Sequence, residues 1–271
     1  MTVPPPSRKR EDFPWWLVAL ALIMGGAAVY IASSELYSQV LATISKGIGI
    51  TIYVSLIGFV LSCALGLLIA LMGLSELLVI RQFARFYVEV MRSIPILVLL
   101  FWIAFAGAPM LAVAWNAITA PLQAQGWTEP IQVRDISLMW RAIIALMIGY
   151  SPFIAEVFRA GFQSVDTGQI EAAKALGLTR YRRMRHIIMP QAIRTMLPPL
   201  GNFFVAIVKD SSLVSVLGVA DVTQMGKIYA AGSFRFFETY SIVAYIYIVL
   251  VIAVSLALRW LERRMQKGYE K

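Results

Sequence analysis

Two charged residues stand side by side where a long apolar stretch ends, at Lys209 and Asp210. An ammonium and a carboxylate in this arrangement could pair with the carboxylate and the amine of one amino acid. Ser211 and Ser212 follow directly and add two hydroxyl groups. If the apolar stretch crosses a membrane, such ionisable groups are costly and indicate a functional site. The alternative is an interfacial anchor in which the two charges pair with each other.

Two more polar residues are candidates for the same solute path. Asn202 precedes Lys209 by seven residues, which is about two helical turns along one face. It could line the path or form a hydrogen bond to a neighbouring helix. Tyr53 lies with Thr51 and Ser55 in another apolar stretch. Their hydroxyls could face a solute, although in helices they more often bond back to a carbonyl of the same helix.

Residue sets for other kinds of chemistry are missing from the sequence. The single histidine, His186, excludes a zinc-binding histidine cluster and a Ser-His-Asp set. The single cysteine, Cys63, lies in an apolar run and is interpreted as a small buried hydrophobic residue. There is no GxxxxGK[ST] pattern, so the chain does not bind ATP through a P-loop. Glu156 or Asp210 could serve a membrane enzyme, but no acid, base and nucleophile cluster, and we expect no enzyme.

The composition indicates that lipid is the main solvent of this chain. Of its 271 residues 59% are hydrophobic and only 14% are charged, and the mean hydropathy is +0.74. Such values exclude disorder and an ordinary soluble enzyme. The net charge of +9 could suit nucleic acid. In so apolar a chain it favours cationic cytoplasmic loops instead, and we expect no nucleic-acid partner.

Six stretches are long and apolar enough to cross a membrane as helices, which predicts an all-α polytopic protein. Between them, the Gly107-Ala108-Pro109 turn is expected to break the third stretch, leaving residues 110–122 at the interface or re-entering. Pro198 and Pro199 should bend or break the fifth, and residues 211–220 should form a helical turn at the periplasmic face. The six expected spans are residues 13–32, 47–75, 86–107, 136–160, 187–208 and 239–258.

The distribution of basic residues predicts the orientation, because Lys and Arg accumulate on the cytoplasmic side. With both termini inside, only six of the 24 Lys and Arg residues fall outside: Lys46, Arg134, Arg141, Lys209, Lys227 and Arg235. A seventh span would place the basic run at 180–185 outside. Arg92 is interpreted as a cytoplasmic anchor, and Glu156 as a structural partner of Arg159 one turn away.

The cytoplasmic loop between the fourth and fifth spans should contain a short capped helix. Thr167 or Gly168 can cap its start, and Glu171 stands in its first turn, where the helix dipole favours a carboxylate. Gly177 is a natural stop, and Thr179 can cap a second helix over residues 180–189. The apolar face of the first helix should contain Ile170, Ala173, Leu176 and Gly177.

The pattern Glu171-Ala172-Ala173, three residues, Gly177, nine residues and Ile187-Ile188-Met189-Pro190 resembles the EAA loop of ABC-transporter importer permeases. Met189 stands where that family has Leu, a change that keeps the volume, and residues 166–167 depart from the family's Pro-Lys. The resemblance covers roughly residues 45–260 and extends to the polar amino-acid permease subfamily. Its other matching segments are residues 51–55 with Gly58, 92–95, 151–156, 198–202 and 209–213.

The resemblance implies a type I ABC-importer transmembrane domain with one added N-terminal helix. Residues 1–45 would form a cytoplasmic tail and the added helix, 46–260 the permease domain with its EAA loop at about 166–190, and 261–271 a cytoplasmic tail. In such permeases the EAA helix docks in a cleft of a cytoplasmic ATPase. The residues expected to couple to that ATPase are Glu171, Ala172, Ala173, Leu176, Gly177 and Leu178.

The family further implies partners and a location. These are cytoplasmic ATP-binding subunits, a second permease subunit of the same or a similar sequence, and a periplasmic or extracellular solute-binding protein, in a bacterial inner membrane. ATP and Mg²⁺ would bind to the partner ATPase and no cofactor to this chain, and the solute would be a polar amino acid such as His, Glu, Gln, Arg or an opine. The alternatives are an ion-coupled secondary amino-acid transporter and an ABC permease for another small polar solute. A channel would need a filter motif, and none is readable.

Overall fold

The computed structural model describes residues 15–267, which contain helices and no strand. Six helical stretches in this part of the chain are long and apolar enough to cross a membrane, so the all-α prediction with six spans is confirmed. Residues 1–14 and 268–271, which include parts of the two predicted cytoplasmic tails, lie outside the described residues. The stretches are Trp15–Ser33, Glu35–Gly73, Ile96–Ala124, Leu138–Gln163, Arg180–Leu217 and Phe236–Met265.

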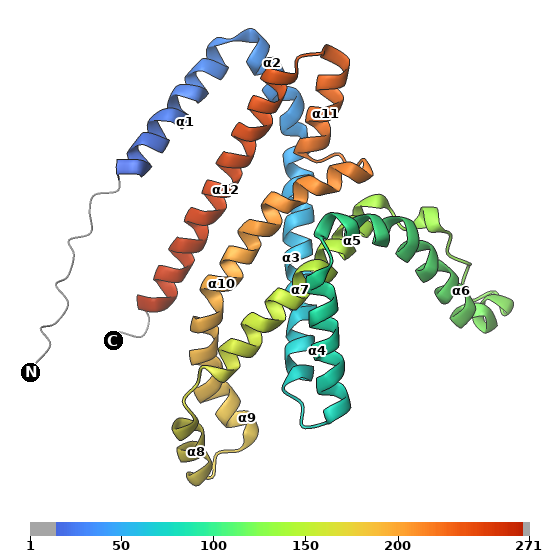
Figure 1. Ribbon diagram of the computed structural model, residues 1–271, viewed down its shortest axis with the longest axis vertical. Coiled ribbons are helices and arrows are strands. Elements are labelled where there is room, and N and C mark those ends of the chain that lie inside the picture. The colour runs from blue at the N-terminus through green and yellow to red at the C-terminus, as the bar shows by residue number, and fades with distance from the viewer. Residues whose placement is uncertain (1–14, 268–271) are drawn as a thin grey trace, which may run out of the picture.

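The centre of the molecule is formed by α3 (Ile48–Gly73), α7 (Leu138–Gln163) and α10 (Met189–Asp210). Their side chains make up most of the largest buried cluster, with Val54, Ile143, Leu146 and Ile207 fully buried. Gly66 lets α3 and α7 approach closely, because a Cβ atom there would lie 3.0 Å from the Ser151 carbonyl oxygen. Figure 1 shows these helices crossing in the middle of the molecule.

The first two helices, α1 (Trp15–Ser33) and α2 (Glu35–Ile44), pack against the last part of the chain. Ile31, Val40 and Ile44 form a buried cluster with Val222 of α11 and residues of α12 (Phe236–Lys267). The rest of α1 contacts little protein, since Ile31 is its one buried residue. The assignment of residues 1–45 as an addition to the permease domain stays a prediction.

The third span differs from the prediction at both ends. A separate helix, α4 (Leu78–Ser93), precedes it and ends before Pro95, because a residue that precedes proline, here Ile94, is disfavoured in helical conformation. The Gly107-Ala108-Pro109 turn does not break the span. A π-helical turn, Ile103–Gly107, connects α5 (Ile96–Trp102) to α6 (Ala108–Ala124) without interruption. Residues 110–122 are therefore part of one bent helix, and α6 lies apart from the other helices in Figure 1.

The fifth span also continues through its prolines. The helix that begins at α9 (Arg180–Arg183) does not stop at Met189 but passes through a second π-helical turn, Met184–Ile188, into α10. Both π-helical turns end two residues before a proline, at Pro109 and Pro190. Proline lacks an N–H and crowds the preceding turn, and a widened turn accommodates this. Pro198 and Pro199 lie inside α10 without breaking it.

Residues 211–220 were expected at the periplasmic face, but the structure places them away from the end of the bundle. A 3-10 helix, η5 (Ser211–Leu217), follows α10, and a further helix, α11 (Val222–Ser233), carries the chain on to the start of α12. Asp221, between η5 and α11, accepts a hydrogen bond from Tyr247 of α12. At a rise of 1.5 Å per residue, Tyr247 lies about 16 Å along α12 from its first residue, Phe236. Figure 1 shows α11 rising from this point to the end of the molecule.

Candidate functional site

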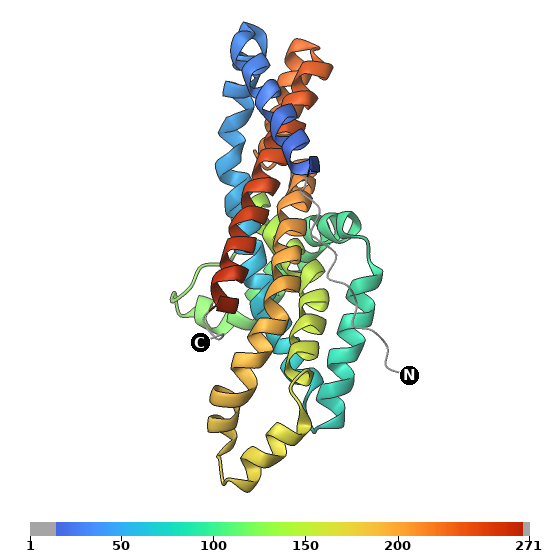
Figure 2. The same ribbon diagram turned by 90° about the vertical axis from the view of Figure 1, so that its left-hand side faces the viewer.

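The short helix α8 (Thr167–Ala175) lies at one end of the molecule between α7 and α9, as both views show (Figures 1 and 2). Its N-cap is Asp166, whose carboxylate accepts a hydrogen bond of 3.1 Å from the Gln169 N–H. The prediction of Thr167 or Gly168 as the cap is therefore wrong by one or two residues. Asp is a stronger N-cap than either, and its side chain reaches the free N–H groups of the first turn.

Gly177 ends α8 as predicted. Its φ of +72° lies in the left-handed region, and a Cβ atom there would meet no other atom within 4 Å. The Gly177 N–H donates to the Lys174 carbonyl at 2.9 Å, and the Leu178 N–H donates to the Ala173 carbonyl at 3.1 Å. This pair of bonds is the Schellman motif. The chain then turns into α9, where Thr179 caps the helix by accepting from the Arg182 N–H, as the sequence indicated.

The two faces of α8 differ in their exposure. Ala173 is only 2% exposed and packs toward the protein, whereas Leu176 is 81% exposed. The prediction of one apolar face that includes Leu176 is thus wrong, because this leucine points away from the protein. Glu171, Ala172 and Gly177 are exposed too, and Leu178 is half-buried.

One side-chain hydrogen bond attaches α8 to α10, and another joins α10 to the end of α7. Gln191 at the start of α10 donates to Gln169 of α8 at 2.7 Å. Ser164 at the end of α7 donates to Thr195 of α10 at 3.2 Å. A displacement of α8 would therefore reach α10 through Gln169, and α7 through residues 164–166, which join the two helices.

The second candidate region is the break between α10 and α11, beside the middle of α12. Irregular backbone at this level of a membrane bundle is tolerated where protein or a cavity surrounds it. Asp221 is fully buried and caps α11 by accepting from the Gln224 N–H at 2.8 Å. The Val222 N–H donates to Thr51 of α3 at 3.2 Å. Sequence reasoning missed Asp221, although the spacing of Asp221 and Gln224 is typical of a helix start.

Asp210 faces a cavity of about 330 Å³ between α5, α7 and α10. Its carboxylate accepts a hydrogen bond of 2.6 Å from the Tyr150 hydroxyl. Phe203 lies edge-on to the Tyr150 ring with centroids 6.3 Å apart, and Phe153 lies 6.0 Å from Phe203. We call this the Asp210 cavity, and its lining residues are Ile94, Ile96, Gly149, Tyr150, Phe153, Phe203, Ala206 and Asp210.

Lys209 faces a different cavity. It lines a space of about 500 Å³ with Ser212, Leu20 of α1 and Tyr247 of α12. Successive residues on a helix point about 100° apart, which separates the ammonium from the carboxylate of Asp210. The expectation that Lys209 and Asp210 face one amino acid together is not met. They do not form an ion pair with each other either, since the one ion pair found within residues 15–267 joins Glu156 and Arg159.

The other predicted solute contacts are spread over the molecule. Ser211 is buried and donates to the Val208 carbonyl of its own helix at 2.8 Å. Asn202 lines a cavity of about 260 Å³ against Arg259 and Glu262 of α12. Tyr53 lies on the surface of α3 and is 41% exposed. The structure therefore does not bring the six residues into one site.

The hydroxyls near Tyr53 have structural roles, and Thr51 accepts from the Val222 N–H as described above. Ser55 donates to the Thr51 carbonyl at 2.7 Å, as the sequence indicated. The aromatic residues that surround Asp210 were missed, because no local pattern connects Tyr150 or Phe153 of α7 with Phe203 of α10. Within residues 15–267 no group of His, Cys, Asp and Glu could hold a metal ion.

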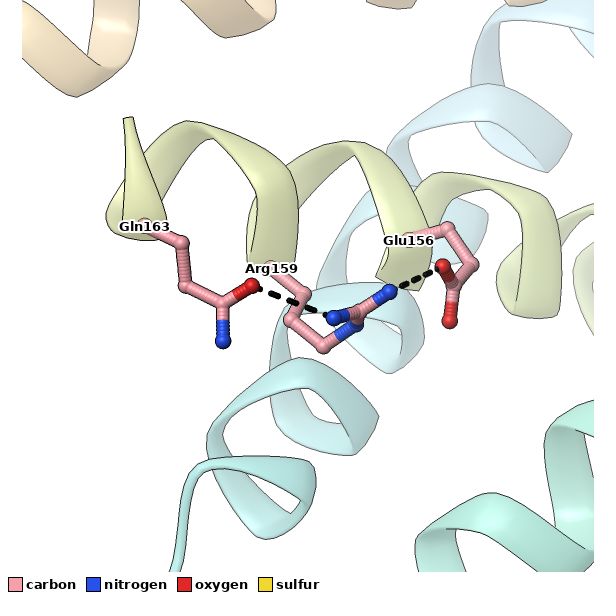
Figure 3. Close-up of polar contacts among 3 residues, drawn as sticks. All are labelled: Glu156, Arg159 and Gln163. Carbon is pink, nitrogen blue, oxygen red and sulfur yellow. Dashed lines mark hydrogen bonds and ion pairs between the residues drawn. The ribbon is translucent and has the colours of Figure 1, made fainter.

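A third region, which we call the charged cavity, lies between α3, α4 and α7 and has a volume of about 450 Å³. Glu156 pairs with Arg159 at 2.6 Å, as predicted, and Arg159 also donates to Gln163 at 3.1 Å (Figure 3). The lining residues are Ile69, Ala70, Gly73, Ala84, Arg85, Val88, Glu89, Arg92, Ala155, Glu156, Arg159 and Gln163. The Arg92 guanidinium lies over the Phe153 ring, 5.3 Å from its centroid.

Comparison with known families decides what kind of molecule this is. The family described as "Binding-protein-dependent transport system inner membrane component" matches residues 62–267, well over half of the chain. The chain belongs to this family. It is therefore an inner-membrane permease component with a transport role, and the family resemblance of its EAA-like loop is confirmed.

Relatives of this permease match over most of their length. The probable amino-acid permease protein YxeN of Bacillus subtilis (strain 168) is 35% identical over 227 residues, which cover 84% of this chain and 93% of the relative. The glutamine transport system permease protein GlnP of Escherichia coli (strain K12) is 34% identical over 221 residues, covering 82% and 92%.

Solved structures confirm the fold of the permease. A crystal structure of an amino acid ABC transporter with histidines aligns with a TM-score of 0.68 at 35% identity, covering 86% of this chain and 98% of that chain. A structure of the MetNI methionine ABC transporter in an inward-facing conformation aligns with a TM-score of 0.58 at 20% identity and shows the fold alone. The predicted fold of an ABC-importer transmembrane domain is therefore correct.

Proposed function

We propose that this permease is the membrane-spanning subunit of an ATP-driven, binding-protein-dependent importer of polar amino acids. It would form half of the translocation path and couple to a cytoplasmic ATPase through α8. The observation that carries this proposal is the construction of α8. This helix is capped at both ends, lies at one end of the molecule and is followed by a leucine, Leu176, that is 81% exposed.

The exposed side of α8 suits a protein partner. Leu176 offers an apolar contact, and the small side chain of Ala172 lets a partner backbone approach closely. Glu171 adds a carboxylate at the rim. Because Gln169 bonds to α10 and residues 164–166 join α8 to α7, closure of two ATPase subunits would draw two α8 helices together and move both spans. Glu171, Ala172, Ala173, Leu176, Gly177 and Leu178 remain the proposed coupling residues.

This assignment also sets the orientation. With α8 on the cytoplasmic side, both termini would be cytoplasmic, as the distribution of Lys and Arg predicts. The helix pair α1 and α2 would be an addition to the permease domain. One chain supplies half of a path, so a second permease subunit of the same or a similar sequence would face it.

The Asp210 cavity supports an amino acid as the solute. Relatives of this chain are amino-acid and glutamine permeases. A carboxylate beside three aromatic rings attracts an ammonium through charge and through the ring faces. We therefore place the ammonium of the solute at Asp210, among Tyr150, Phe153 and Phe203. This replaces the joint contact with Lys209.

A second candidate is an ion-coupled secondary transporter, which the broken helix at residues 209–221 favours, since such transporters bind solute and ions at discontinuous helices. An importer of another small polar solute is a variant of the first proposal. The secondary transporter differs from the first proposal in its energy source, and the importer of another solute differs in what it carries.

The test is uptake by proteoliposomes that contain the permease with its co-purified ATPase and solute-binding proteins. His, Glu, Gln and Arg form the panel, and a sugar serves as the negative control. We expect uptake of at least one amino acid that requires ATP and persists when ion gradients are collapsed. Uptake that needs an ion gradient and no ATPase would overturn the proposal in favour of the secondary transporter. Uptake of the sugar alone would overturn the amino-acid assignment.

A further inference from the structure

We propose that the charged cavity is a second solute site, which binds the carboxylate of an amino acid after its ammonium leaves Asp210. This inference rests on the proposed import of amino acids. It assigns Arg85 and Arg92 of α4 as the residues that bind the carboxylate, with Glu89 between them as the partner of the ammonium.

The balance of charges in the cavity favours an anionic group. Glu156 and Arg159 neutralise each other at 2.6 Å. The remaining ionisable residues are Arg85, Glu89 and Arg92, and within the described part of the chain none of the three forms an ion pair. Two guanidinium groups and one carboxylate therefore stay available. They match the one carboxylate and one ammonium of an amino acid with one positive charge in excess.

The position of these charges indicates a polar space. Arg85, Glu89 and Arg92 are exposed along α4, and they follow each other at helical spacings of four and three residues, so they share one face. The helix α4 is not among the six candidate spans, so these exposed charges can be solvated.

The base of the cavity is apolar and tightly packed. Ala84 and Val88 of α4 pack there against Ala70 of α3 and Ala155 of α7. A volume of about 450 Å³ is within the range of small-molecule sites. The cavity thus combines polar walls with an apolar base that could accommodate the aliphatic part of a side chain.

The charged cavity and the Asp210 cavity share a wall. Arg92 lines the first, Phe153 lines the second, and the Arg92 guanidinium lies 5.3 Å from the centroid of the Phe153 ring. A cation–π contact is weaker than a two-point bond between a guanidinium and a carboxylate. The carboxylate of a solute would therefore compete with Phe153 for Arg92 and open the partition. Passage would proceed from an ammonium site at Asp210 to a carboxylate site at Arg92 and Arg85.

The test measures equilibrium binding to the purified complex of permease and ATPase without ATP or binding protein. Glutamine is compared with two analogues, glutaramate, which lacks the amine, and 4-aminobutanamide, which lacks the carboxylate. We expect Arg92→Gln and Arg85→Gln to raise the Kd for glutaramate at least tenfold and to leave that for 4-aminobutanamide unchanged. Asp210→Asn should do the reverse.

The matched control is Arg81→Gln, which removes the same charge from the same helix. Arg81 does not line the cavity, and its guanidinium donates to the Ser75 carbonyl at 3.2 Å. We expect its Kd for glutaramate to stay within twofold of the wild-type value. Phe153→Leu should lower the Kd several-fold, because Arg92 loses the ring that competes with the carboxylate.

Unchanged glutaramate binding in Arg92→Gln and Arg85→Gln, or an equal loss in Arg81→Gln, would overturn the inference. If Arg92→Gln does not fold, Arg92→Lys decides in its place, since lysine keeps the charge but cannot form the two-point bond. Wild-type uptake is measured in the same preparation. ATP-driven uptake with unaltered glutaramate binding rejects only the second site, whereas uptake without any need for ATP rejects the proposed function itself.

Discussion

At α8 and at the break between α10 and α11 one helix ends and another begins, but the two regions are built in contrasting ways. The bonds that cap α8 are local, from the Gln169 N–H to Asp166 and from the Gly177 N–H to Lys174. At the break, bonds from remote parts of the chain join the local ones. Asp210 accepts from Tyr150 of α7, and Asp221 accepts from Tyr247 of α12.

The difference in construction matches a difference in role. An exposed, locally capped helix keeps its shape while its surroundings change, which suits the transmission of motion to a partner. A buried break depends on three spans at once, so it responds to any change in their packing. Four substitutions separate these properties, and the one that should perturb the protein most is at Gly47.

Gly47→Ala should disrupt the break. A Cβ atom at Gly47 would fall against the backbone of Asp221 and Val222, which cannot rotate away as a side chain can. Overpacking of this kind costs about 3 kcal/mol of the free energy of unfolding. Thermal unfolding of the purified permease in detergent measures the effect. Gly49→Ala is the control, since nothing lies within 4 Å of a Cβ atom there. Equal melting temperatures for the two variants would show that the contact at Gly47 is not needed.

Asp221→Ala should be the next most damaging. It removes a helix cap and leaves the half-buried Tyr247 hydroxyl with Thr223 as its remaining partner, and the two losses together cost about 2 kcal/mol of unfolding free energy. Asp221→Asn keeps an oxygen for the Gln224 N–H and should retain most of the stability. The comparison is again made by thermal unfolding. A stable Asp221→Ala variant would mean that water replaces the carboxylate, and the break would then be less enclosed than the structure indicates.

The contrast also explains what the sequence could predict. Gly177 and Thr179 were identified because a stop and a cap depend on neighbouring residues. The six spans were identified because length and hydropathy determine them. The Asp210 cavity was not predicted, because Tyr150, Phe153 and Phe203 come together only through the packing of α7 and α10.

The errors have physical causes of the same kind. Adjacency in the sequence suggested that Lys209 and Asp210 act together, whereas a helix directs them into different cavities. Pro109 suggested an interruption, and a short helix was expected to end at Met189 before Pro190, but in each case a π-helical turn accommodates the proline inside a continuous helix. The depth of residues 211–220 depends on α11, whose place is set by contacts with α2, α3 and α12.

Gly177→Val should separate transport from ATP hydrolysis. Valine in the left-handed region costs about 1–2 kcal/mol, and the last turn of α8 with Leu176 would relax to avoid it. We expect proteoliposomes with this variant to hydrolyse ATP while uptake falls at least tenfold. Gly177→Asn is the matched control, because asparagine tolerates a positive φ. Transport at the wild-type rate in Gly177→Val would refute the role of α8 in coupling.

Asp166→Ala should have the smallest effect and completes the comparison with Asp221→Ala. Both substitutions remove an aspartate that caps a helix, but Asp166 is exposed, and its side chain makes one hydrogen bond, to the Gln169 N–H. Water can replace that bond, so the loss should be about 1 kcal/mol, confined to α8. Hydrogen exchange of the α8 amides should accelerate about fivefold, which corresponds to that free energy, while the melting temperature stays unchanged. A global loss of stability as large as that of Asp221→Ala would contradict the view that α8 is a locally determined helix, because its cap would then support the packing of α7 and α10.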